Sequence, residues 1–440
     1  MTHTLRSLIT ILIILLATPR TEAGDGHSLV ADSLTRTSLP GATVFDRHGK
    51  AVGVCDTDGR TPYIDENRYP LTVRYLGYRE KRVAAPTDTI FLRERHLQLP
   101  EVVVESRKRT VLHILAYVRE YSTLTTYSDT VFLFREKTVD YMLPSDNKGK
   151  FKGWSSPRIL KCKSYYRFTD NMGTDSVSDE SNYHFSWSDW VGVRPALSLP
   201  TPLRGTESAR DTLRGKYSPA ELWTRKGDRV TVDVDVLADT TSRKWVPKLA
   251  GFFRDGLEFE NFKLRYSFDN VTGDLVRPID LNAYSFSIES DGRGHDMFRF
   301  NRHDEAFFVS TYAEAYILDK KYISVKEAKQ WDRRLTDFDA AIGIYSTRDV
   351  PELQPSIREL IARVENIDKG AFRTTLIPDL RLAWNLGRKK KQEHIGQRLL
   401  RMLKVATGIS RYKMNRNLNR GWNEFRTDWT HHNDKQEEEK

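Results

Sequence analysis

Three titratable side chains stand together at His303, Asp304 and Glu305, and their residue types could support acid–base chemistry. A histidine beside two carboxylates could hold and move a proton near neutral pH. Successive residues of an extended chain point to opposite faces, however, so these side chains do not converge on one point. We therefore predict solvated charges before a strand and no catalytic residue. A dispersed pair of carboxylates of the glycosidase type remains an alternative.

Asp56 and Asp58 invite a calcium-loop interpretation. The loop of a helix–loop–helix calcium site ends on a bidentate glutamate at its twelfth position, where this chain has Asn67. The stretch 56–59, Asp-Thr-Asp-Gly, is also typical of a tight turn, because Gly59 tolerates positive φ. We predict a structural turn there, and we assign no metal and no cofactor to the chain. Zinc-protease, nucleophile-elbow and P-loop motifs do not occur in the sequence.

Two stretches could bind without catalysis. Tyr183, Trp187 and Trp190 gather on an alternating segment and could form an aromatic platform for sugar rings, although aromatic packing within the fold is the alternative. A basic run near the C-terminus could contact anionic lipid or glycolipid phosphates, with a solvated helix face as the alternative. Its residues are Arg388, Lys389, Lys390, Lys391, Arg398, Arg401 and Lys404.

The first 23 residues are typical of a secretory signal peptide. Arg6 precedes an uncharged, Leu/Ile-rich run at 7–18, and residues 21–23 (Thr-Glu-Ala) offer a cleavage site. An uncleaved anchor is the alternative, and no cysteine follows the run to accept a lipid. Export argues against nucleic acid as the partner for the net charge of +10 and favours anionic lipids or acidic glycans. Cys55 and Cys162 predict two separate thiols, with a single bridge as the alternative.

Residues 27–105 alternate short β segments with turns, which predicts a small β-sandwich. Four motifs follow in order: LPGATV at 39–44, DTDG at 56–59, YLGY at 75–78 and LPEVVV at 99–104. Together they resemble the carboxypeptidase regulatory-like domain family. The chain departs from the family pattern at Pro62, which removes a donor from the strand ladder.

This resemblance implies a transthyretin-type β-sandwich that serves as an accessory module in exported proteins of Gram-negative bacteria. Such modules are common at the N-termini of outer-membrane transporters. They are not catalytic, so the resemblance implies no peptidase activity.

Residues 110–320 are expected to form a large antiparallel sheet that can curl into a half-barrel. An exception is 111–121, where the spacing of Leu112, Leu115 and Ala116 predicts a helix. Elsewhere apolar and polar residues alternate with the period of a strand. The predicted strands are 130–143, 159–169, 183–187, 230–236, 262–268, 284–288 and 307–318.

Residues 322–430 are expected to be helical and basic. Ser324 and Glu327 form a capping-box pattern that starts a helix through 335, and 356–364 predicts a second helix. A third is predicted over 395–406, with Gly408 placed to end it. Residues 431–440 are expected to be a disordered tail.

The fold class is therefore mainly β with α. The function expected is that of a non-enzymatic binding or scaffolding protein in the periplasm or at the periplasmic face of the outer membrane. Its partner would be another envelope protein, such as an outer-membrane transporter, or an anionic lipid or glycolipid surface. A periplasmic carrier of a lipid-like ligand, and a glycan or peptide hydrolase with an accessory sandwich, are the alternatives.

Overall fold

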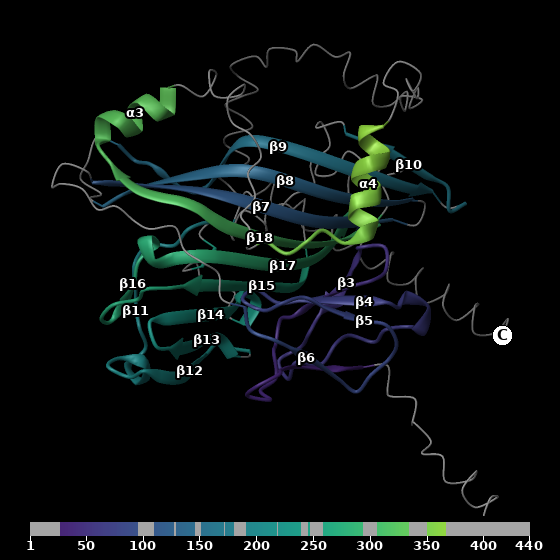
Figure 1. The fold of residues 1–440 in the computed structure, drawn as a ribbon, viewed down its shortest axis with the longest axis horizontal. Coiled ribbons are helices and arrows are strands. Elements are labelled where there is room, and N and C mark those ends of the chain that lie inside the picture. Colours follow the sequence, from purple (N-terminus) through teal and green to yellow (C-terminus); the bar gives the residue numbers. More distant parts are fainter. Residues whose placement is uncertain are drawn as a thin grey trace, which may run out of the picture.

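A computed structural model describes residues 27–95, 110–126, 129–145, 151–170, 172–179, 191–217, 219–238, 245–246, 258–293, 306–333 and 350–366. Over these residues the protein is mainly β, as predicted, with an N-terminal sandwich, one large antiparallel sheet and two α-helices (Figure 1). The predicted signal peptide, the LPEVVV motif at 99–104, the predicted strand 183–187, the third helix at 395–406 and the C-terminal tail lie outside the described residues.

The N-terminal sandwich has two layers that close over one apolar core. In one layer β1 (Leu29–Asp32) runs parallel to β6 (Thr89–Leu92). The other layer has the order β3-β2-β4-β5, formed by β3 (Ala51–Val54), β2 (Thr43–Phe45), β4 (Leu71–Arg74) and β5 (Lys81–Val83). Buried side chains from both layers, among them Val30, Val44, Val73 and Leu92, fill the space between them.

The predicted turn at 56–59 is confirmed. The Asp56 carboxylate accepts hydrogen bonds from the backbone N–H groups of Asp58 (3.0 Å) and Arg60 (2.8 Å). The side chain of Asp56 therefore satisfies backbone donors of its own turn. Gly59 has a φ of +81°, and a Cβ there would lie 3.0 Å from the Val30 carbonyl oxygen. Both observations explain why this position is glycine.

The large sheet contains ten strands, and all neighbouring strands are antiparallel. Their spatial order is β10-β9-β8-β7-β18-β17-β15-β14-β13-β12, so β18 returns to pair with β7 and joins two meanders. The strands are β7 (Val111–Thr125), β8 (Asp129–Pro144), β9 (Trp154–Asp170), β10 (Asp175–Ser178), β12 (Ser208–Arg214), β13 (Pro219–Lys226), β14 (Arg229–Asp235), β15 (Glu258–Phe268), β17 (Leu281–Arg293) and β18 (Ala306–Ile323). Within the described part of the chain the sheet is open, with β10 and β12 at its edges.

The helix predicted over 111–121 is wrong, because these residues form the first half of β7. Leu112, Ile114, Ala116 and Val118 point to one face of the sheet and are buried there. The residues between them are also covered, by other parts of the chain, so almost every residue of β7 is buried. Because both faces of β7 are buried, apolar residues occur on both, and the sequence lacks a clear alternation of apolar and polar residues.

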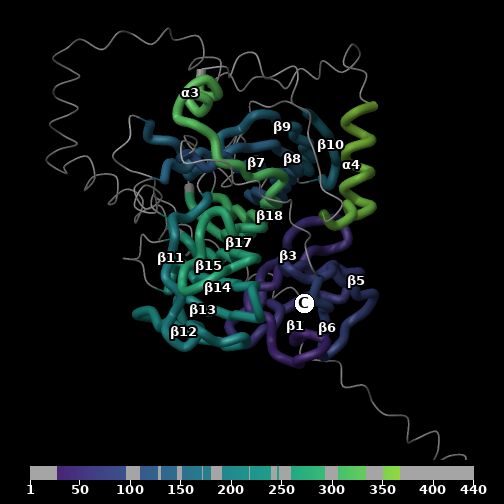
Figure 2. Tube along the Cα trace, turned by 60° about the vertical axis from the view of Figure 1, so that its left-hand side comes forward, coloured from purple at the N-terminus to yellow at the C-terminus, as the bar shows by residue number. Residues whose placement is uncertain are grey.

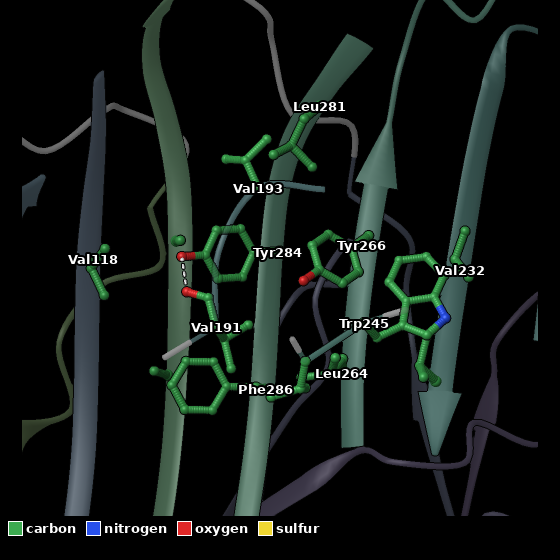
Figure 3. Packing of buried hydrophobic residues seen from close by; sticks show 14 of the residues in the cluster. Val118, Val191, Val193, Val232, Trp245, Leu264, Tyr266, Leu281, Tyr284 and Phe286 are labelled. Atoms are coloured by element: carbon green, nitrogen blue, oxygen red, sulfur yellow. Dashed lines mark hydrogen bonds between the residues drawn. The ribbon is translucent and has the colours of Figure 1, made fainter. Parts of the chain in front are cut away.

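One face of the large sheet, here called the inner face, carries the main apolar core. Residues 191–203, which include β11 (Leu197–Ser198) and the 3₁₀ turn Thr201–Leu203, supply buried Val191 and Val193 to it. Tyr266 and Tyr284 donate hydrogen bonds to the carbonyl oxygens of Gly192 (3.0 Å) and Val191 (3.2 Å), which fixes this segment on the sheet (Figure 3).

The opposite face, here called the outer face, is covered by the sandwich and by α4 (Pro355–Glu365) (Figures 1 and 2). Ile357, Leu360 and Val364 of α4 pack on the aromatic side chains of β7, β8 and β9. This helix confirms the prediction at 356–364.

A second helix, α3 (Val325–Arg333), follows β18 directly and confirms the predicted capping box. The Ser324 N–H donates to the Glu327 carboxylate (2.7 Å), and the Glu327 N–H donates to the Ser324 hydroxyl (3.2 Å). Among the described helices none has the length and apolar character needed to cross a membrane. Cys55 and Cys162 are free thiols, the first buried and the second half-buried.

Candidate binding cleft

The sandwich meets the outer face of the large sheet through a contact centred on Arg265 of β15. The Arg265 guanidinium donates to the Leu76 carbonyl oxygen (2.9 Å), to the Tyr75 hydroxyl (2.7 Å) and to the Asp233 carboxylate (2.6 Å). It also lies over the Tyr75 ring, 4.0 Å from the ring centroid. Because one guanidinium bonds to both units, the sandwich is held on the sheet in one orientation.

Burial fixes the protonation states of this contact. Burial raises the pKa of Tyr75 well above its ordinary value, so the hydroxyl keeps its proton and donates to Asp233 (3.1 Å). Burial alone would lower the pKa of Arg265, but the Asp233 carboxylate and Tyr75 outweigh it and raise that pKa. The guanidinium therefore stays positively charged and the Tyr75 hydroxyl stays protonated across the physiological pH range. The hydrogen bonds and charges of this contact thus do not change over that range.

Arg265 and Asp233 belong to a row of charged residues that crosses the outer face. The antiparallel register places one residue of each strand directly opposite the next, on the same face. We call these residues the charge row: Asp233, Arg265, Ser285, Glu314, Arg119, Glu136 and Lys163. Its charges alternate in sign, apart from the serine, and opposite charges on facing positions stabilise the pairing of strands.

A second sandwich side chain, Arg74, reaches the charge row at Glu314. Arg74 is buried and lies 3.7 Å from Glu314, 2.9 Å from Glu80, and within hydrogen-bond distance of the Tyr121 hydroxyl (2.8 Å). The Glu314 carboxylate also accepts hydrogen bonds from Tyr312 (2.6 Å) and Tyr316 (2.9 Å). Two arginines, one from each unit, thus bind the sandwich and the sheet to each other.

Two adjoining cavities of about 200 and 180 Å³ lie between the sandwich and the outer face of strands β12 to β15. Both are lined by Ser38, Pro40, Tyr75, Arg210, Leu222, Asp233 and Arg265. Along β14, Asp235 lines the first cavity, Asp233 lines both, and Thr231 and Arg229 line the second. The cavities therefore form one cleft that follows the direction of the strands, and we call it the seam cleft.

Most charges in the seam cleft are already paired. Lys226 forms an ion pair with Glu94, and Arg229 forms one with Asp269 (2.8 Å). Lys263 donates to the Cys55 carbonyl oxygen (3.1 Å) and stands opposite Asp235 in the register of β14 and β15.

Arg210 of β12 differs from these cations. It lies on the wall that both cavities share, is exposed, and has no hydrogen bond or ion pair with any described residue. Its guanidinium is therefore free to bind a ligand.

The seam cleft offers polar side chains as hydrogen-bonding and charged groups. Its walls offer hydroxyls, such as those of Ser285 and Ser287, together with the fixed donors of Tyr75 and Arg265. Groups of three or more His, Cys, Asp or Glu that could hold a metal ion are not found within the described residues. The arrangement can accept hydrogen bonds, donate them and pair with charge.

A second polar cluster lies on the outer face near α3. The Asp140 carboxylate accepts two hydrogen bonds from Arg158 (2.8 and 2.6 Å), one from Trp154 (3.2 Å), and lies 3.2 Å from His113 Nε2. The Trp331 ring of α3 covers His113, with ring centroids 4.9 Å apart. Asp140 is fully buried, and the contacts of His113 with Trp331 and of Arg158 with Asp332 (3.6 Å) attach α3 to the sheet.

The residues singled out from the sequence are placed as follows. Asp56 and Asp58 lie in a turn of the sandwich, where the Asp56 carboxylate accepts backbone hydrogen bonds. The aromatic platform (Tyr183, Trp187 and Trp190), the titratable group (His303, Asp304 and Glu305) and the basic run (Arg388, Lys389, Lys390, Lys391, Arg398, Arg401 and Lys404) all lie outside the described residues.

Sequence reasoning missed the residues of the seam cleft. A signal was present, because alternation places Asp233 and Asp235 on one face of a strand and Lys263 and Arg265 on one face of another. Those charges would have predicted a cross-strand pairing once the two strands were recognised as neighbours.

Comparison with known proteins adds little to this description. No family model matches the chain, and no curated protein matches it. Among solved structures, a lipovitellin structure described for its lipid–protein interactions is similar with a TM-score of 0.25 and 7% identity. The similarity covers 50% of this chain and 26% of the lipovitellin chain, so this chain spans about a quarter of that structure.

Proposed function

We propose that this chain is an exported envelope protein, with a carboxypeptidase regulatory-like sandwich, that binds a ligand in the seam cleft without transforming it. The observation that carries the proposal is the pair of adjoining cavities between two units that are fixed to each other. Boundaries between domains are common places for ligand sites, which combine an apolar lining with a few convergent polar groups.

The rigidity of the cleft supports binding. Arg265 and Tyr75 are held by the same hydrogen bonds that join the sandwich to the sheet, so they are in place before a ligand arrives. A preformed wall lowers the entropy lost on binding, which favours affinity.

Export and the envelope location remain predictions from the first 23 residues and from the four motifs of the sandwich. They favour a partner found in the periplasm or at the outer membrane: another envelope protein, or an anionic lipid or glycolipid. The sandwich would then serve as a scaffold that positions the sheet and its ligand.

A periplasmic carrier of a lipid-like ligand is the second candidate, and one observation favours it. The inner face gathers apolar and aromatic side chains, including Tyr141, Tyr266, Tyr284 and Phe286, as such a carrier requires. Residues 191–203 pack on this face, so a lipid would have to displace them or bind beside them. The hydrolase alternative stays a prediction.

The seam cleft can be tested with Leu222→Trp, which enlarges a half-buried side chain on the wall that both cavities share. Leu275→Trp is the matched control, because Leu275 is 45% exposed on β16 (Leu275–Val276), away from the cleft. Each protein would be purified from native envelope extract and its mass recorded under non-denaturing conditions.

We expect a reproducible extra mass on the wild type and on Leu275→Trp, and its loss from Leu222→Trp. An extra mass that Leu222→Trp retains would contradict a ligand in the seam cleft, and so would a wild type that carries none.

A further inference from the structure

The two cavities of the seam cleft are nearly equal in size and adjoin at one shared wall. At about 30 Å³ of liquid per water molecule, volumes of about 200 and 180 Å³ correspond to roughly seven and six waters. Each is thus on the scale of one small ring rather than of a long acyl chain. The shared wall allows two linked rings to occupy both cavities at once.

About half of the polar side chains that line the two cavities carry hydroxyl groups. Ser38, Thr57, Thr212, Ser285 and Ser287 line the first cavity, and Thr35, Thr37, Thr224 and Thr231 line parts of the second. A hydroxyl both donates and accepts, so such walls match a ligand whose own groups are hydroxyls. Pro40 and Leu222, on the shared wall, provide apolar surface for the C–H faces of a ring.

The charged side chains of the lining leave one place in the cleft that favours a negatively charged group of a ligand. Lys226, Arg229 and Arg265 are neutralised by Glu94, Asp269 and Asp233, and Lys263 faces Asp235. Of the cations that line either cavity, only Arg210 lacks a partner within the described residues. The planar fork of a guanidinium matches a carboxylate in a bidentate pair.

We propose that the seam cleft binds an acidic disaccharide unit, with one sugar ring in each cavity and a uronic-acid carboxylate on Arg210. This inference rests on the proposed function of the cleft. A single charge on the ligand matches the single uncompensated guanidinium, and Asp235 disfavours a second carboxylate at the far end of the first cavity. One ring therefore carries the acid and the other is neutral.

The test compares the mature full-length chain with Arg210→Gln. Arg214→Gln is the matched control, because Arg214 is an exposed arginine on the same strand and does not line the cleft. Binding would be measured by isothermal titration calorimetry at physiological ionic strength. The probes are disaccharides containing glucuronic, galacturonic or mannuronic acid, each beside its neutral hexose counterpart.

We expect at least one uronic-acid disaccharide to bind the wild type, with its neutral counterpart at least tenfold weaker. Arg210→Gln should weaken the acidic probe at least tenfold and leave the neutral probe unchanged, and Arg214→Gln should change neither. Both arginines are exposed, so the variants are expected to fold as the wild type does.

Two results would overturn the inference while the proposed function stands. One is equal binding of acidic and neutral probes. The other is binding of no probe by a protein whose extra native mass is still lost in Leu222→Trp. If no probe binds and the extra mass does not depend on Leu222, the inference and the proposed function both fail.

Discussion

Arg265 and Asp233 face each other across β15 and β14, and the guanidinium lies 2.6 Å from both carboxylate oxygens. The same guanidinium donates to the backbone of the sandwich at Leu76. The residues that form an ion pair between two strands of the sheet therefore also join the sheet to the sandwich. Together with the contact between Arg74 and Glu314, this pair holds the sandwich on the sheet and keeps the seam cleft in shape.

Removing the guanidinium should therefore destabilise the protein. Arg265→Met leaves Asp233 without its charged partner, and breaking a buried pair costs about 3–5 kcal/mol. Side-chain exposures of 11% for Arg265 and 21% for Asp233 let solvent screen part of this, so we expect a loss of about 2 kcal/mol.

Urea unfolding of Arg265→Met, with exposed Arg214→Met as the control, measures this loss. A change within about 0.5 kcal/mol of the control would show that the pair does not hold the two units together.

Gly59→Ala should destabilise the sandwich through both strain and contact. The φ of +81° is unfavourable for alanine, and its Cβ would lie 3.0 Å from the Leu39 nitrogen and the Val30 carbonyl oxygen. Gly205→Ala is the matched control, since Gly205 has a φ of +66° and nothing within 4 Å of an added Cβ.

We expect a loss of about 1 kcal/mol for Gly205→Ala from backbone strain and about 2–3 kcal/mol for Gly59→Ala. Equal losses in thermal unfolding would mean that the packing around Gly59 relaxes freely.

Alternation predicted β8, β9, β14, β15, β17 and β18 of the large sheet, whereas it did not indicate β10, β12 or β13. Val230, Val232 and Val234 alternate with Thr231 and Asp233, and β14 lies where this pattern placed it. It failed at residues 111–121, because the outer face of β7 carries Leu115, Tyr117 and Tyr121 beside Arg119, so apolar and aromatic residues occur on both faces of the strand. A pattern of period two is visible only where the residues of the two faces differ in polarity.

The seam cleft could not be predicted, for a different reason. Tyr75 and Asp233 are 158 positions apart, and their contact depends on where the sandwich docks on the sheet. Nothing in the local sequence sets that docking. The alternation fixes which residues share a face, while the strand order, with β18 returning to β7, decides which faces meet the sandwich.

Asp140 should make the protein less stable in acid. Burial alone would raise its pKa, but hydrogen bonds from His113 and Arg158 outweigh burial and hold the pKa below the ordinary value of 3.8. A carboxyl whose pKa is lower in the folded chain stabilises the fold above its unfolded pKa, and this contribution is lost as the pH falls through the folded pKa.

Asp140→Asn removes this charge and leaves Arg158 unpaired, so we expect a loss of about 3 kcal/mol at neutral pH. The difference from the wild type should shrink below about pH 4. Denaturant unfolding over a pH series measures it, with Asp319→Asn, at an exposed carboxylate, as the control. A difference that does not vary with pH would rule out the charge as the cause.

Glu289 of β17 should act in the opposite direction. Burial raises its pKa above 4.5, and the hydrogen bond from Asn261 (3.3 Å) does not compensate. A carboxyl whose pKa is higher in the folded chain favours folding at low pH, and that contribution is lost as the pH rises through the folded pKa. Ionised Glu289 therefore weakens the fold near neutral pH.

Glu289→Gln keeps the shape of the side chain and removes the ionisation, so it should raise the unfolding midpoint at neutral pH and leave it unchanged in acid. The exposed Glu352→Gln is the control and should shift the midpoint at neither pH. The two substitutions are thus expected to change stability at neutral pH in opposite directions. Asp140→Asn should be less stable than the wild type, and Glu289→Gln more stable. A Glu289→Gln midpoint below that of the wild type at neutral pH would mean that the carboxylate gains more from its contacts than burial costs it.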